Sequence, residues 1–115
     1  MMEDFDRTNF EDIVGDDVTE LEEAHKHYGI SWRRRGGVGA FMMLARKWDR
    51  LENKVVEFNW DIFIAMEDDQ REEGILDDIR DLRRYLLLVE EFINTTKEEK
   101  NNAEENYGIS QAIET

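Results

Sequence analysis

Apolar residues recur at steps of three and four in three stretches of the chain, which is the spacing of one face of an α-helix. The first stretch predicts a helix over residues 18–28, and Gly29 stands where a helix commonly ends. The second predicts a helix over residues 38–56, and the third predicts one over about residues 73–94. The pattern therefore predicts an all-α protein, a bundle of three to four main helices that is completed by self-association.

The segments outside these helices are less regular. Residues 1–15 have scattered aromatics and no clear period, which indicates an arm or a short turn. Residues 57–72 hold an aromatic cluster and a polar end, so they form either a short helix or an ordered loop. Residues 95–115 form a tail whose segment 95–106 is polar all round, which predicts either a solvated extension or fraying. We expect one domain over residues 1–115, with residues 16–94 as its helical core.

Composition adds few restrictions beyond this. The chain has no cysteine, which excludes disulfides, thiolate metal sites and a cysteine nucleophile. It has no proline, as expected of a helical protein. No run of about 18 apolar residues is present, and the first residues are acidic rather than of the signal-peptide type. A cytoplasmic protein is the expectation.

The balance of charge restricts the partners. The formal net charge is −14, from 29 acidic and 15 basic residues. Such a field repels nucleic acid and anionic membranes, so we expect neither as a partner. It suits a protein that binds divalent cations, although acidity can also serve solubility alone.

Helical geometry brings several carboxylates to the edge of the predicted core. Advancing by about 100° per residue, Glu52 falls on the apolar face of the second helix and Asp49 at its edge. On the third helix, Asp78 and Asp81 flank the apolar face, with Tyr85 between them in angle. Buried carboxylates require either arginine partners or divalent cations, and we favour a site for Mg²⁺ or Mn²⁺ over surface ion pairs. Another acidic pair, Glu20 and Glu23, is predicted to face solvent.

A basic cluster precedes the second helix. Arg33, Arg34 and Arg35 are followed by Gly36 and Gly37. Helix N-termini favour anions, and glycines let backbone N–H groups approach phosphate oxygens, so these arginines are candidate phosphate ligands. Trp32 either stacks on a base or packs in the core.

These motifs resemble a known group of enzymes. DRLE at 49–52 and DIRD at 78–81 have the spacing of the carboxylate motifs in the MazG-like, all-α NTP pyrophosphatase superfamily, with aspartate at positions 49 and 78 where that pattern has glutamate. The segments HYGISWRRR, ARKWDRLE and EEGILDDIRDLRRY are similar to the nucleotide modification associated domain that is widespread in phages. The likeness spans about residues 20–93. It includes a K-x-x-R element at Lys47 and Arg50, and a motif formed by Glu73, Asp77 and Tyr85.

The resemblance implies an oligomeric helical bundle, a homodimer or homotetramer. It also implies hydrolysis of a (deoxy)nucleoside triphosphate to monophosphate and pyrophosphate with two or more Mg²⁺ or Mn²⁺ ions. A purine such as dGTP is the candidate substrate. On this hypothesis Glu52 orients or deprotonates the attacking water, and the predicted metal ligands are Asp49, Glu52, Asp77, Asp78 and Asp81.

The remaining candidate site residues are predicted to contact the nucleotide. Lys47 and Arg50 point away from the apolar face of their helix, so we expect them to reach phosphate from the groove rim or a neighbouring subunit. Trp32 and Tyr85 are candidate nucleotide contacts. Two alternatives need no catalysis: an acidic helical regulator or inhibitor, and a protein that sequesters a nucleotide.

Overall fold

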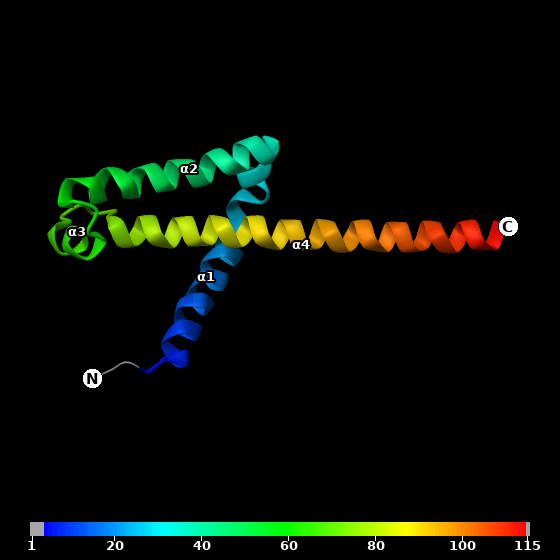
Figure 1. The fold of residues 1–115 in the computed structure, drawn as a ribbon, viewed down its shortest axis with the longest axis horizontal. Helices are drawn as coiled ribbons and strands as arrows, with labels where there is room; N and C mark the ends of the chain where they lie inside the picture. The colour runs from blue at the N-terminus through cyan, green and yellow to red at the C-terminus, as the bar shows by residue number, and fades with distance from the viewer. Residues whose placement is uncertain (1–3, 115) are drawn as a thin grey trace.

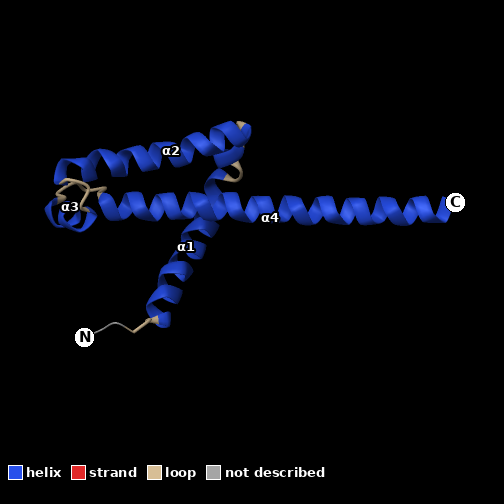
Figure 2. Cartoon of the chain, viewed as in Figure 1, coloured by secondary structure: helices blue, strands red, loops and turns tan. Residues whose placement is uncertain are grey.

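The computed structural model describes residues 4–114, with side chains described for residues 4–104. Its α-helices are α1 (Arg7–Tyr28), α2 (Gly36–Val55), α3 (Ile62–Asp68) and α4 (Ile75–Glu114) (Figure 1). Two single-turn 3₁₀ helices, η1 (Ser31–Arg33) and η2 (Val56–Phe58), lie on either side of α2. Residues 4–114 contain no strand (Figure 2), which confirms the predicted all-α class.

α1 begins well before the predicted start at residue 18. The side chain of Asp6 accepts a hydrogen bond from the backbone N–H of Asn9 at 3.1 Å, and this N-cap starts the helix at Arg7. The predicted arm or turn over residues 1–15 is therefore wrong from Arg7 onward. At the other end the prediction is confirmed, because Gly29 adopts φ 55° and donates its N–H to the carbonyl of His25.

α2 and α4 form the central layer of the molecule. They run antiparallel, and α2 covers the first half of α4 (Figure 1). Their packing is closed at one end by α3 and η2, where the most buried apolar residues lie. This cluster consists of Leu51, Val55, Ala65 and Ile75, with Phe58, Ile62 and Ile79 packed against it.

The segment between α2 and α4 contains a short helix, which is one of the two forms predicted for residues 57–72. Asp61 caps α3 by accepting hydrogen bonds from the backbone N–H groups of Phe63 and Ile64, both at 3.1 Å. The side chain of Asp69 accepts a hydrogen bond from the backbone N–H of Ile75 at 2.7 Å, at the start of α4. Capping carboxylates therefore set both helix starts.

α4 is much longer than the helix predicted to end near residue 94. It continues as helix to Glu114, so this part of the chain is an extension rather than a frayed end. Its side chains are exposed over residues 96–104. Among the side chains that are described, those of the first half of α4 therefore make its packing contacts.

The molecule is elongated. Its extents are 69 × 38 × 29 Å and its radius of gyration is 19.9 Å, against about 13 Å for a compact domain of this length. α1 crosses α4 at a steep angle, and its N-terminal half projects from the body (Figure 2). Among the described helices, none combines the length and the apolar character needed to span a membrane.

Candidate functional site

Two adjoining pockets follow the junction of α1, α2 and α4. Both are lined by Leu21 and Ala24 of α1 and by Tyr85 and Leu88 of α4, so they adjoin along the contact between these two helices. Each has a volume of about 260 Å³. We call this surface the α1–α4 groove; it has an aromatic end and a charged end.

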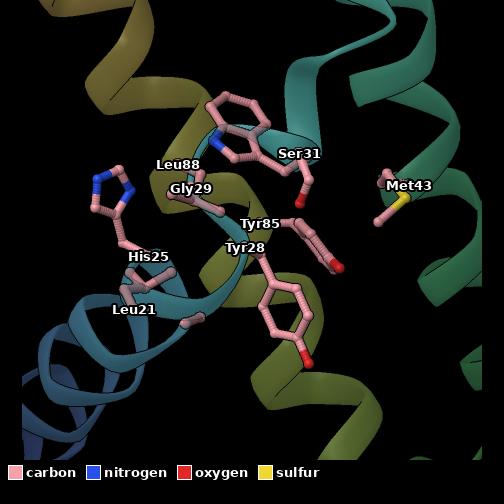
Figure 3. A pocket seen from close by; sticks show the side chains of 10 residues that line it. Leu21, His25, Tyr28, Gly29, Ser31, Met43, Tyr85 and Leu88 are labelled. Carbon is pink, nitrogen blue, oxygen red and sulfur yellow. The ribbon is translucent and has the colours of Figure 1, made fainter.

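The aromatic end is built by the YGISW segment. Tyr28 of α1, Tyr85 of α4 and Met43 of α2 lie around one opening (Figure 3). Gly29, Ser31 and Trp32 line the same pocket from the turn between α1 and α2. Because drug-sized ligands occupy pockets of roughly 300–1,000 Å³, this volume suits a single flat ring system.

Trp32 has a half-buried position between two cavities. Its ring meets Phe92 edge-on at 6.1 Å, and the residue also lines a separate groove on the other side of the α2–α4 pair. The indole therefore packs against α4 and still borders the aromatic pocket. Both interpretations of Trp32 fit this position.

The charged end of the groove combines acids and bases. Asp81 lines it, and its carboxylate contacts the ammonium group of Lys47 at 2.9 Å. Glu20 of α1 and Arg84 of α4 line the same pocket. Glu20 and Glu23 are both exposed, as predicted; Glu20 also lines this pocket, and Glu23 pairs with Lys26 and His27 on its own helix.

A buried carboxylate fixes Arg84 beside this groove. Asp17 is 0% exposed and accepts hydrogen bonds from Arg83 and, at 2.8 Å, from Nε of Arg84. The Arg83 hydrogen bonds lower the pKa of Asp17 most; burial opposes this shift and Arg84 adds to it. Asp17 in turn raises the pKa of Arg83. This triad anchors α1 to α4 and holds the orientation of Arg84.

A second buried carboxylate lies between α2 and α4. Asp78 is 1% exposed and accepts a hydrogen bond from Nε of Arg50 at 2.8 Å, with Arg71 on its other oxygen at 3.5 Å. Arg50 also donates to the carbonyl of Glu73 at 3.2 Å, and Asp78 raises its pKa. Arg71 in turn lowers the pKa of Asp69, the cap at the start of α4. Asp78 is thus held in an arginine network.

The orientation predicted for Lys47 and Arg50 is wrong. Both side chains face α4, where they pair with Asp81 and Asp78. The long apolar stems of lysine and arginine can cover a helix interface while their heads stay polar, so a helical wheel that counts them as polar misplaces them. The two motifs of the sequence therefore do meet, but through ion pairs.

Glu52 and Asp49 lie away from the groove. Glu52 accepts a hydrogen bond from the indole of Trp48 at 2.7 Å, and Trp48 continues the face of α2 that carries Phe41. That face borders the opposite groove of the α2–α4 pair. Asp49 is exposed. The structure thus separates Glu52 from Asp81 and does not assemble the predicted carboxylates into one cluster.

Asp77 has a local role in the structure. Its carboxylate accepts a hydrogen bond from the backbone N–H of Gly74 at 3.0 Å, in the turn that begins α4, and lies 3.8 Å from Arg80. Across residues 4–104, no three or more His, Asp or Glu side chains are arranged to hold a metal ion. The predicted five-carboxylate metal site is therefore not formed within one chain.

The arginine run divides between packing and solvent. The guanidinium of Arg33 lies over the ring of Phe92, 4.3 Å from its centroid. Arg34 is exposed, and Arg35 precedes α2 with its side chain above Gly39, where a Cβ would come within 2.8 Å of it. The three arginines do not converge on a single point.

The sequence contained signals for some of the residues that were missed. Asp17 lies four residues before Leu21 and eleven before Tyr28, so it shares their side of α1. Two consecutive arginines on the core helix are natural partners for such a carboxylate. Glu20 and Met43 carried no comparable signal, because their place depends on how three helices cross.

Comparisons of the chain with protein-family models, with curated proteins and with solved structures find no match. The geometry of the groove and the motif resemblance are therefore the grounds on which a function is proposed.

Proposed function

We propose that the protein is a metal-dependent (deoxy)nucleoside triphosphate pyrophosphohydrolase that binds its substrate in the α1–α4 groove. One observation carries the proposal: an aromatic pocket of about 260 Å³ shares four lining residues with a pocket lined by two carboxylates and an arginine. A nucleotide has the same order of chemistry, a flat ring at one end and a polyanion at the other. The resemblance to MazG-like enzymes supports the reaction, in the cytoplasm, by a homodimer or homotetramer.

The groove suggests how the substrate is oriented. The base stacks among Trp32, Tyr28 and Tyr85, whose faces accept any base. The phosphates then extend toward Arg84, which lines the charged end, and toward Lys47, whose ammonium group contacts Asp81. Ser31 supplies a hydroxyl for the edge of the base. A purine such as dGTP remains the first substrate to test.

The carboxylates of this end fit a cation that arrives with the nucleotide. Mg²⁺ is commonly held by one or two carboxylates together with substrate phosphates, and Glu20 and Asp81 provide such a pair. The bound ion would neutralise phosphate charge and lower the pKa of a coordinated water. The larger predicted set does not fit, because Asp78 is enclosed by arginines and Glu52 lies on the other face.

The Lys47–Asp81 ion pair has a different role with and without substrate. With no substrate bound, Lys47 neutralises Asp81, whose side chain is 41% exposed. A triphosphate offers Lys47 a stronger anionic partner and leaves Asp81 for the cation. Lys47 thereby binds phosphate from the groove itself rather than from a neighbouring subunit.

The test is incubation with each dNTP and NTP plus Mg²⁺ or Mn²⁺, followed by quantification of monophosphate and pyrophosphate. We expect both products in equal amounts from one or two substrates. Asp81→Asn and Glu20→Gln should each lower kcat/KM by about 100-fold or more, as loss of a key electrostatic group does. Glu23→Gln, three residues further along the same helix, is the matched control and should keep wild-type activity.

Two results would contradict this proposal. Orthophosphate as the product would show stepwise dephosphorylation. Wild-type turnover in both Asp81→Asn and Glu20→Gln would remove the groove from the reaction.

A second candidate is a non-catalytic acidic helical regulator or nucleotide-sequestering protein. It is favoured by the pairing of Asp17, Asp78 and Asp81 with basic side chains, which leaves the structure satisfied without a cation. Melting temperatures separate a nucleotide-binding protein from a regulator that binds no nucleotide, and the turnover assay separates the enzyme from a sequestering protein. A nucleotide-binding protein gains stability from dGTP with Mg²⁺, whereas a polyanion-mimicking regulator gains none.

A further inference from the structure

The face of the α2–α4 pair opposite the α1–α4 groove is apolar and uncovered. Phe41 and Trp48 of α2 and Leu86 and Ile93 of α4 form it, and we call it the outer flank. Phe41 is 66% exposed and Leu86 is 50% exposed. Phe41 and Ile93 line a groove of about 480 Å³ between the two helices.

The periodicity of both helices makes this flank continuous. Phe41 and Trp48 are seven residues apart, as are Leu86 and Ile93, so each pair lies on one line along its helix. Leu44 and Val89 line the groove between those lines. The result is an apolar stripe on each helix with the geometry of a bundle interface.

The chain alone buries too little surface. Its accessible area is 9564 Å², against about 6,600 Å² for a compact monomer of this mass. Among the described side chains, the buried apolar ones are Ala40, Leu51, Val55, Ala65 and Ile75, and two of these are alanines. A standard interface removes about 800 Å² from each partner, and the excess is larger than this although it also includes the exposed polar part of α4.

We propose that a second copy of this chain packs its own outer flank against this one. Two α2–α4 hairpins then form a four-helix bundle around a shared apolar core. The same patch serves on both copies, as a two-fold interface requires. A second copy is the occupant for two reasons. The flank has an apolar stripe on each helix and a groove between them, so the same stripes of another copy can pack into it. The small core of one chain would also be completed by two further helices. The α1–α4 grooves stay open on the outer faces.

The test uses size-exclusion chromatography with light scattering from about 1 to 100 µM chain. We expect a mass of twice 13.7 kDa or a higher multiple for the wild type. Phe41→Glu on α2 and Leu86→Glu on α4 should each weaken self-association by at least about 100-fold, since two copies of the charge would enter one apolar interface. Phe63→Glu is the matched control, because Phe63 of α3 is 80% exposed and lies outside the flank.

Far-UV circular dichroism checks that the glutamate variants stay helical. A second readout needs no disruptive substitution. The chain has no cysteine, so Leu86→Cys introduces a single thiol on the flank and Phe63→Cys a single thiol elsewhere. A bifunctional maleimide should link two chains through the first far faster than through the second.

The proposal is overturned by a monomeric wild type at 100 µM. It is also overturned if both glutamate variants keep the wild-type mass, or if the two cysteine variants crosslink equally fast.

Discussion

Asp17 and Asp78 are charged groups that the fold has buried, and each is enclosed by two arginines. Burying a carboxylate costs free energy unless both of its oxygens accept hydrogen bonds. In Asp17 and Asp78 the arginines donate hydrogen bonds to both oxygens. The two networks lie at different interfaces, α1 against α4 and α2 against α4. Each therefore fixes the position of one helix on α4.

Removing the charge of Asp17 should loosen α1. Asp17→Asn leaves Arg83 and Arg84 without their carboxylate, and we expect a loss of about 2–3 kcal/mol in the free energy of unfolding, because the arginines retain some contact with water. Asp16→Asn, at the exposed neighbouring position, should change it by less than about 0.5 kcal/mol. Urea titration measures both. Equal effects in the two variants would contradict the role of the triad.

The same carboxylate predicts a dependence on pH. Its pKa in the folded chain lies below the ordinary value of 3.8, so the folded state holds its proton less tightly than the unfolded state. The stabilisation is therefore complete above about pH 5 and is lost as pH falls through the lowered pKa. Urea midpoints from pH 6 to pH 3 should fall more steeply in the wild type than in Asp17→Asn. Parallel curves would show that Asp17 does not contribute.

Single residues also show where sequence reasoning ends. Gly29 and the apolar stripes follow local rules, so the ends and faces of helices are readable from the chain. Whether Lys47 contacts α4 or solvent depends on the rotation of α2, which is set by Leu51 and Val55 packing beneath α3. Asp81 was correctly placed beside the core, but its lysine partner was not predicted.

At the scale of elements, the existence of the main helices was predicted better than the residues at which they begin and end. The start of α1 was missed because acids interrupt its apolar positions, Phe10, Val14 and Val18, which are exposed and so look irregular in sequence. The capping carboxylate of Asp6 was a usable signal. Residues 95–106 of α4 are polar all round, so periodicity alone does not separate a helix from a frayed end there.

The distal half of α4 should be dispensable for folding. Ending the chain after residue 96 removes exposed positions only within the part whose side chains are described, so we expect the free energy of unfolding to change by less than about 0.5 kcal/mol. Helical circular dichroism should fall in proportion to the residues removed. Ending it after residue 88 instead removes Val89 and Phe92 from the packed half and should be strongly destabilising. Equal stability of the two chains would contradict this division.

At the scale of the whole molecule, the two faces of the α2–α4 pair differ in chemistry. One side carries the α1–α4 groove, with its aromatic and charged ends, and the other carries the apolar outer flank. The sequence predicted a bundle completed by self-association but not which face each residue belongs to. Glu52 and Asp81 lie on different faces of the α2–α4 pair, and the pattern of apolar residues along one helix does not predict this.

The polar half of α4 also determines how the protein diffuses. About 20 residues of helix beyond residue 94 add roughly 30 Å of length with little mass. Friction grows with length more than with mass, so the particle moves through water as a much larger globular protein would. Elution volume calibrated on compact standards would then suggest an extra subunit, and mass must be taken from scattered light or sedimentation equilibrium.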